Sequence, residues 1–88
     1  MNTNVATKKE KTRTTAVKSL VLWYDESTNL ESIIASTIEI CNITRKESVD
    51  IVLDSLLDGT AKLRTGNKET LLPLQAAFRK IAIKTTIE

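Results

Sequence analysis

The sequence predicts a small, mainly α-helical protein, and three observations lead to this prediction. Aromatic residues are limited to Trp23, Tyr24 and Phe78, so the core must consist of Leu, Ile, Val and Ala. Only two glycines and one proline interrupt the 88 residues, which suits packed helices better than a sandwich with many turns. Apolar residues also recur at intervals of three and four positions, as they do on one face of a helix.

Two parts of the chain differ in their capacity to fold. Residues 1–14 are rich in Thr, Lys and Asn and have little apolar surface to bury, so they are predicted to be a mobile basic arm. Residues 15–88 have enough apolar content for a single small domain, and the length leaves no room for a second one.

The segment 15–24 is compatible with two structures. Its β-branched and aromatic content is typical of a strand. A helical face can also be drawn through it, so both interpretations remain open. The alternating set is Leu20, Leu22 and Tyr24, and the helical set is Val17, Leu20, Val21 and Tyr24.

A helical hairpin is predicted over 30–42 and 45–58, with 64 as an alternative end. Thr44 and Glu47 form a capping box at the start of the second helix. Gly59 ends this helix, or else it continues to Arg64 and stops before Gly66. The expected buried faces are Leu30, Ile33, Ile34, Ile38 and Cys41 in the first helix, and Val49, Val52, Leu53, Leu56 and Leu57 in the second.

A third helix is predicted over 70–83, with Asn67 or Thr70 as its N-cap. Pro73 is tolerated only in a first turn, which places the start near Thr70. The competing interpretation is a β-hairpin over 70–87, because apolar and β-branched residues alternate near its end. The helical face is Leu71, Leu74, Phe78, Ile81 and Ala82, and the alternating set is Ile81, Ile83, Thr85 and Ile87.

The residue inventory argues against an enzyme. The chain has no histidine and one cysteine, so no internal disulfide and no common metal site can be built, and no cofactor or catalytic residue is predicted. Cys41 is expected to be a small apolar residue on a buried helix face. No apolar stretch is long enough to span a membrane and no secretory signal is visible, so a cytoplasmic location is expected.

Charge is distributed unevenly along the chain. The net charge is +4 over residues 1–18, −6 over 19–59 and +4 over 60–88. Basic ends of this kind suit contact with a polyanion. The residues predicted to meet DNA phosphates are Lys8, Lys9, Lys11, Arg13, Arg79, Lys80 and Lys84.

Residues 29–71 resemble the helical hairpin of the HU/IHF nucleoid proteins, including the entry to their sheet. This resemblance implies an α+β fold and DNA binding, although no residue of that family's DNA-embracing arms can be carried over. The matching positions are Ile33–Ile34, Ile43–Thr44–Arg45, Leu63, Gly66, Lys68 and Leu71.

Residues 17–59 also resemble a ribbon–helix–helix repressor, with the segment from Ser19 to Tyr24 as the ribbon. In that family alternate ribbon residues read the major groove, and here the outward set would be Ser19, Val21 and Trp23. The second helix matches at Thr44, Arg45, Glu47, Val49 and Leu53.

Two functions are therefore considered. The first is a small DNA-associated accessory or regulatory protein of phage or plasmid type, expected to form a homodimer. The alternative is a protein-binding inhibitor or adaptor module that acts on a larger machine without touching nucleic acid. In that case an exposed apolar helix face and the acidic middle of the chain would form the contact surface.

Overall fold

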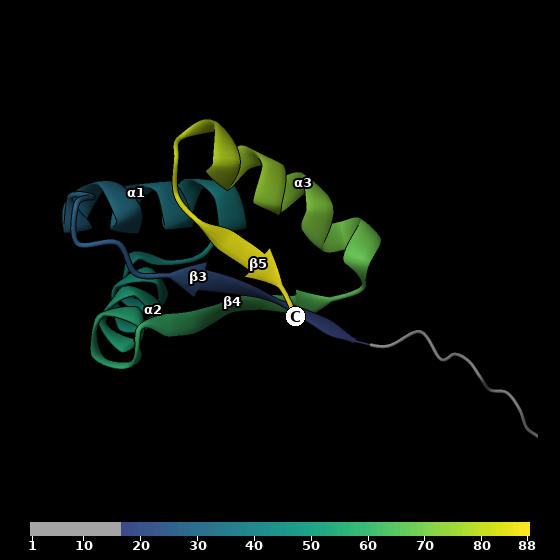
Figure 1. The fold of residues 1–88 in the computed structure, drawn as a ribbon, viewed down its shortest axis with the longest axis horizontal. Helices are drawn as coiled ribbons and strands as arrows, with labels where there is room; N and C mark the ends of the chain where they lie inside the picture. Colours follow the sequence, from purple (N-terminus) through teal and green to yellow (C-terminus); the bar gives the residue numbers. More distant parts are fainter. Residues whose placement is uncertain (1–16) are drawn as a thin grey trace, which may run out of the picture.

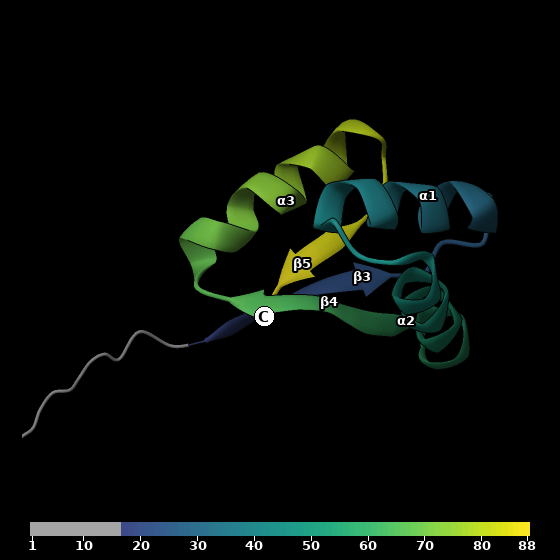
Figure 2. The same cartoon turned by 180° about the vertical axis from the view of Figure 1, so that it is seen from behind.

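The computed structural model describes residues 17–88, which form a three-stranded antiparallel sheet with three helices (Figure 1). Figures 1 and 2 show α1 and α3 lying over the same face of the sheet, while α2 sits at one end beside β4. The predicted arm, residues 1–14, lies outside the described residues. The elements in chain order are β3 (Lys18–Trp23), α1 (Leu30–Cys41), α2 (Arg45–Asp58), β4 (Thr60–Gly66), α3 (Lys68–Lys80) and β5 (Thr85–Ile87).

The central strand is β3, and the strand order is β4-β3-β5. Leu22 pairs with Ala61 of β4 on one side and with Thr85 of β5 on the other. The β3–β4 register shifts between Leu20 and Val21, which leaves Leu63 of β4 as the extra residue of a bulge. The segment 15–24, for which both a helix and a strand were considered, thus contains a strand, in keeping with its β-branched and aromatic content.

One core lies between the sheet and the helices. Leu20 and Leu22 lie two positions apart on β3 and therefore share one face of the sheet. Both are completely buried, in one cluster with Ile33 of α1 and Phe78 of α3. Phe78 of α3 is also completely buried and is the largest side chain in this core. The other members of the cluster are Ile33, Cys41, Val52, Leu63, Leu71 and Ile83.

The ends of α1 and α2 are set by local sequence. The Asn29 side chain accepts a hydrogen bond from the Ser32 amide at the start of α1, and Asn42 ends that helix in a left-handed conformation (φ 56°). The Thr44–Glu47 capping box is confirmed, with both of its reciprocal hydrogen bonds present. Gly59 ends α2 with φ 89°, so the alternative end at residue 64 is wrong.

The predicted buried stripe of α2 is largely wrong. Of its five members only Val52 is fully buried, whereas Leu53, Leu56 and Leu57 are 47%, 41% and 81% exposed. The buried positions are instead Ser48, Val52 and Ser55. Both serine hydroxyls donate to backbone carbonyls, at 2.8 Å to Ile34 and 2.7 Å to Val52, and this removes the cost of burying them.

The third helix begins two residues earlier than predicted. The Asn67 side chain accepts a hydrogen bond from the Thr70 amide at 2.9 Å, and the helix continues past Pro73 to Lys80. It ends three residues before the predicted end, so Ile83 lies in the loop that leads to β5, where it is buried. The competing β-hairpin over 70–87 is not formed, although its last residues do become β5.

The predicted mainly α class is therefore wrong, because the protein has an α+β fold. The segment Thr60–Gly66 was considered a continuation of the second helix, and it is instead a strand. It pairs with β3, and even the two paired residues that are closest in the sequence, Trp23 and Thr60, are far apart along the chain. Within residues 17–88, no helix is both long enough and apolar enough to cross a membrane.

Candidate functional site

The C-terminal end of β3 brings aromatic and acidic side chains together around a hollow of about 500 Å³. The backbone amide of Tyr24 donates to the carbonyl of Gly59 at 2.9 Å, which fixes the chain as it leaves the sheet. The next residues turn back toward α1. We call this feature the acidic–aromatic hollow, and it is lined by Trp23, Tyr24, Asp25, Glu26 and Lys84.

Trp23 is held in one orientation on the sheet face opposite to Leu22. Its indole N–H donates to the hydroxyl of Thr86 on β5 at 2.8 Å. The Lys84 ammonium lies 4.5 Å from the centroid of the Trp23 ring, a favourable cation–π distance. The hollow therefore has one fixed aromatic wall with a positive charge beside it.

Asp25 supplies a fixed negative charge. Its carboxylate accepts hydrogen bonds from the Ser27 hydroxyl at 2.7 Å and from the Ser27 amide at 2.9 Å. These bonds hold the pKa of Asp25 below its ordinary value of 3.8. Glu26 is exposed beside it. Two carboxylates beside two aromatic rings suit a ligand that joins an ammonium group to an apolar side chain.

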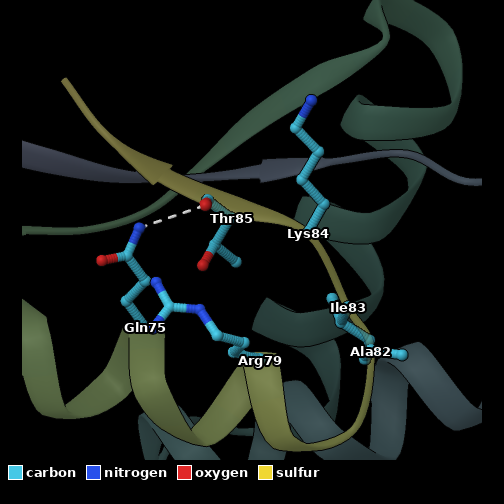
Figure 3. Close-up of a pocket in the computed structure, with 6 residues that line it drawn as sticks. All are labelled: Gln75, Arg79, Ala82, Ile83, Lys84 and Thr85. Atoms are coloured by element: carbon cyan, nitrogen blue, oxygen red, sulfur yellow. Dashed lines mark hydrogen bonds between the residues drawn. The ribbon is translucent and has the colours of Figure 1, made fainter.

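A second hollow, of about 310 Å³, lies between α3 and β5 (Figure 3). The Gln75 side-chain amide donates to the carbonyl of Thr85 at 3.2 Å and closes one side. In Figure 3 the Arg79 side chain extends toward Gln75, whereas the Lys84 side chain extends away from α3. The two positive charges that line this hollow therefore do not converge on one point.

The structure does not bring the predicted phosphate-binding residues together. Lys8, Lys9, Lys11 and Arg13 lie outside the described residues. Arg79 and Lys84 line the hollow of Figure 3, but Lys80 borders a different, apolar groove of about 520 Å³ between α1 and α3. The basic residues of the C-terminal part are thus divided between two sides of α3.

The acidic–aromatic hollow was not predicted from the sequence. No site was predicted at Asp25 and Glu26, and Trp23 was predicted only as an outward residue of a DNA-reading ribbon. A detectable signal was present, since two aromatics are followed directly by two acids. Lys84 could not be found in this way, because only the β3–β5 pairing brings it to Trp23.

Within residues 17–88, no three His, Cys, Asp or Glu side chains are placed to bind one ion. Cys41 is completely buried, and this burial raises the pKa of its thiol above the ordinary value of 9.0 despite the nearby charge of Arg64. The aspartates of α2, Asp50, Asp54 and Asp58, lie along an exposed helix face.

Comparison with known proteins gives one informative result. No protein-family model matches the chain, and no curated protein matches its sequence. Among solved structures, the fold is similar to that of Agrobacterium tumefaciens ClpS2 bound to L-phenylalaninamide. The TM-score is 0.77 at 11% sequence identity, and the similarity covers 84% of this chain and 96% of that chain. The two proteins therefore share a fold over nearly the whole described domain.

This result corrects the DNA-associated interpretation. That interpretation was drawn from the basic ends of the chain and from resemblances to HU/IHF proteins and ribbon–helix–helix repressors, and the similar structure belongs to neither group. The observed α+β fold and the divided basic residues do not support it either. The prediction of a DNA-associated regulator of phage or plasmid type is therefore wrong. The expected homodimer stays a prediction.

Proposed function

We propose that the protein is a protein-binding adaptor module that recognises a peptide with a free amino group next to an apolar side chain. The observation that carries this proposal is the position of Asp25 and Glu26 beside Trp23 and Tyr24 in the acidic–aromatic hollow. A peptide amino-terminus offers both an ammonium group and a neighbouring side chain. The proposal takes up the adaptor alternative considered from the sequence.

The fold comparison adds a chemical parallel. The ClpS2 structure holds L-phenylalaninamide, a molecule with an amino group, an aromatic side chain and an amide. In the present chain, the carboxylates would bind the amino group and the aromatic walls would contact the side chain. Lys84 adds a donor at the edge of the hollow, where an amide oxygen could accept a hydrogen bond.

Electrostatics favour this ligand at neutral pH. Asp25 is ionised at neutral pH, and the two hydrogen bonds that Ser27 donates lower its pKa further and fix its direction. A preorganised carboxylate loses little freedom when an ammonium group arrives, so more of the interaction energy remains for binding. The Lys84 charge is directed to the Trp23 ring, which leaves the carboxylates available.

The direct test is calorimetric titration of the protein with L-phenylalaninamide and with its N-acetylated form. We expect binding of the first and a loss of about tenfold or more in affinity for the second, because acetylation removes the positive charge. Asp25→Asn should weaken binding similarly while keeping an acceptor for Ser27. Glu69→Gln, which removes an acid in the first turn of α3, is the matched control.

Equal binding of the free and acetylated ligands would contradict the proposed recognition of an amino group. Equal losses in Asp25→Asn and Glu69→Gln would show that net charge, and not the hollow, determines binding. The absence of an enzymatic activity and the cytoplasmic location stay predictions.

A further inference from the structure

The outward side of α2 carries two parallel rows of side chains. Residues advance by about 100° per position around a helix, so side chains four apart lie almost in line. One row, the leucine row, consists of Leu53, Leu56 and Leu57. The other, the aspartate row, consists of Asp50, Asp54 and Asp58, and all six residues are exposed.

The leucine row is not part of the core. The side of α2 that faces α1 and β4 is formed by Ser48, Val52 and Ser55, which are completely or almost completely buried. Leu57 is 81% exposed and therefore contacts little of the described domain. Three neighbouring leucines on one exposed helix face are unusual for a surface that remains in water.

The aspartate row favours a partner that carries positive charge. Its three carboxylates lie along one edge of the leucines, and among the described residues only Lys46 forms an ion pair with this row, at 3.2 Å from Asp50. That pair is highly exposed, so it is weak and easily exchanged. A partner with apolar side chains flanked by Lys or Arg would complement both rows.

A second copy of the chain fits this surface less well. If two α2 helices packed through their leucine rows, six aspartates would border one contact. Like charges at that distance oppose association, whereas a basic partner would neutralise them.

We propose that the outward face of α2 is a docking surface for a basic amphipathic helix of a partner protein. The leucine row receives the apolar stripe of that helix, and the aspartate row pairs with its lysines or arginines. This surface shares no residue with the acidic–aromatic hollow. The proposal therefore does not depend on the function proposed above.

The test uses two synthetic helical peptides with the same leucine stripe, one flanked by lysines and the other by glutamates. Fluorescence anisotropy with the full chain should show binding of the lysine peptide and none of the glutamate peptide. Leu57→Ser should weaken binding by about tenfold, because an exposed apolar anchor is lost. Leu72→Ser, at a leucine of α3 that is 44% exposed, should leave the affinity unchanged.

Charge is tested by replacing the whole aspartate row with asparagine. The matched control replaces three exposed acids outside both α2 and the acidic–aromatic hollow with glutamine, namely Glu39, Glu69 and Glu88. Only the aspartate-row variant should lose affinity for the lysine peptide and lose the salt dependence of binding. All of these positions are exposed, so the variants should fold, and circular dichroism checks this.

Three results would overturn the proposal. Equal losses in the two triple variants would mean that the peptide responds to net charge alone. If the glutamate peptide bound as tightly as the lysine peptide, charge complementarity would not contribute to binding. A dimer that Leu57→Ser dissociates in sedimentation would show that a second copy covers this face. Loss of L-phenylalaninamide binding in Asp25→Asn, with unchanged peptide binding, would separate this surface from the hollow.

Discussion

Arg64 of β4 donates a hydrogen bond from its guanidinium group to the backbone carbonyl of Cys41, the last residue of α1. The last carbonyls of a helix have no partner within the helix and carry a partial negative charge. A guanidinium group provides both the missing hydrogen-bond donor and a compensating positive charge. One side chain of the sheet thus holds the end of a helix that precedes it by two elements.

Arg64→Met should therefore lower the free energy of unfolding by about 1–2 kcal/mol, since it removes a charge-assisted hydrogen bond to a partly buried carbonyl. Urea denaturation followed by circular dichroism measures this loss. Lys62→Met is the control, because Lys62 is an exposed base on the same strand. If both variants lose the same amount, the contact with Cys41 is not stabilising.

Cys41 should be unreactive in the native protein. Its thiol is buried and its pKa is raised, so little thiolate forms at pH 8 and reagents cannot reach it. Alkylation by iodoacetamide should be slow in buffer and fast in concentrated urea. Rapid modification of the folded protein would mean that the end of α1 opens readily.

Thr44→Ala should cost about 1 kcal/mol of unfolding free energy through loss of the cap of α2. The side chain of Thr44 accepts from the amide of Glu47 at 3.1 Å, and alanine cannot replace this acceptor. Thermal or urea denaturation provides the measurement. Thr70→Ala is a suitable comparison, because the Thr70 hydroxyl donates to the capping side chain of Asn67 at 2.9 Å but does not itself accept from a helix amide.

The same capping box should make stability depend on pH. Hydrogen bonds from Thr44 hold the pKa of Glu47 below its ordinary value of 4.5. A group whose pKa is lower in the folded state contributes stability above its unfolded pKa and loses it as the pH falls through the folded value. Glu47→Gln should therefore reduce the loss of stability on acidification below pH 4.5. An unchanged profile would contradict this contribution.

Val52→Ala and Leu53→Ala should have clearly different effects, although these residues are neighbours. Val52 is almost completely buried, so its truncation should cost about 2 kcal/mol. Leu53 is about half exposed, so its truncation should cost less than about 1 kcal/mol. Urea denaturation of the two variants compares them directly. A larger loss for Leu53 would mean that the packing of α2 differs from the one described.

Local signals in the sequence predicted the helices well. The capping box and Gly59 determined both ends of α2, and Asn29 and Asn42 lie at the ends of α1. These features depend on residues within one turn of each other, so a sequence pattern contains them. The predicted end of the third helix was less accurate, because Ile83 was counted as helical and instead packs from a loop.

Non-local features were predicted poorly. Thr60–Gly66 becomes a strand only because β3 is available beside it, and the sequence of β4 has no clear alternation of its own. The buried face of α2 was misjudged because Ser48 and Ser55 count as polar, although their hydroxyls find backbone acceptors within the fold. The acidic–aromatic hollow depends on another long-range pairing, because β5 pairs with β3 and so brings Lys84 to Trp23.

The position of β3 in the sheet has a consequence for folding during synthesis. This strand is made before both of its neighbours, yet Trp23 pairs with Thr60 and Leu22 with Thr85. While the chain emerges from the ribosome, β3 has two open edges and two large apolar side chains without a partner. Contacts between residues so distant in sequence form slowly. We therefore expect the nascent chain to be most prone to aggregation until β4 has emerged to pair with β3.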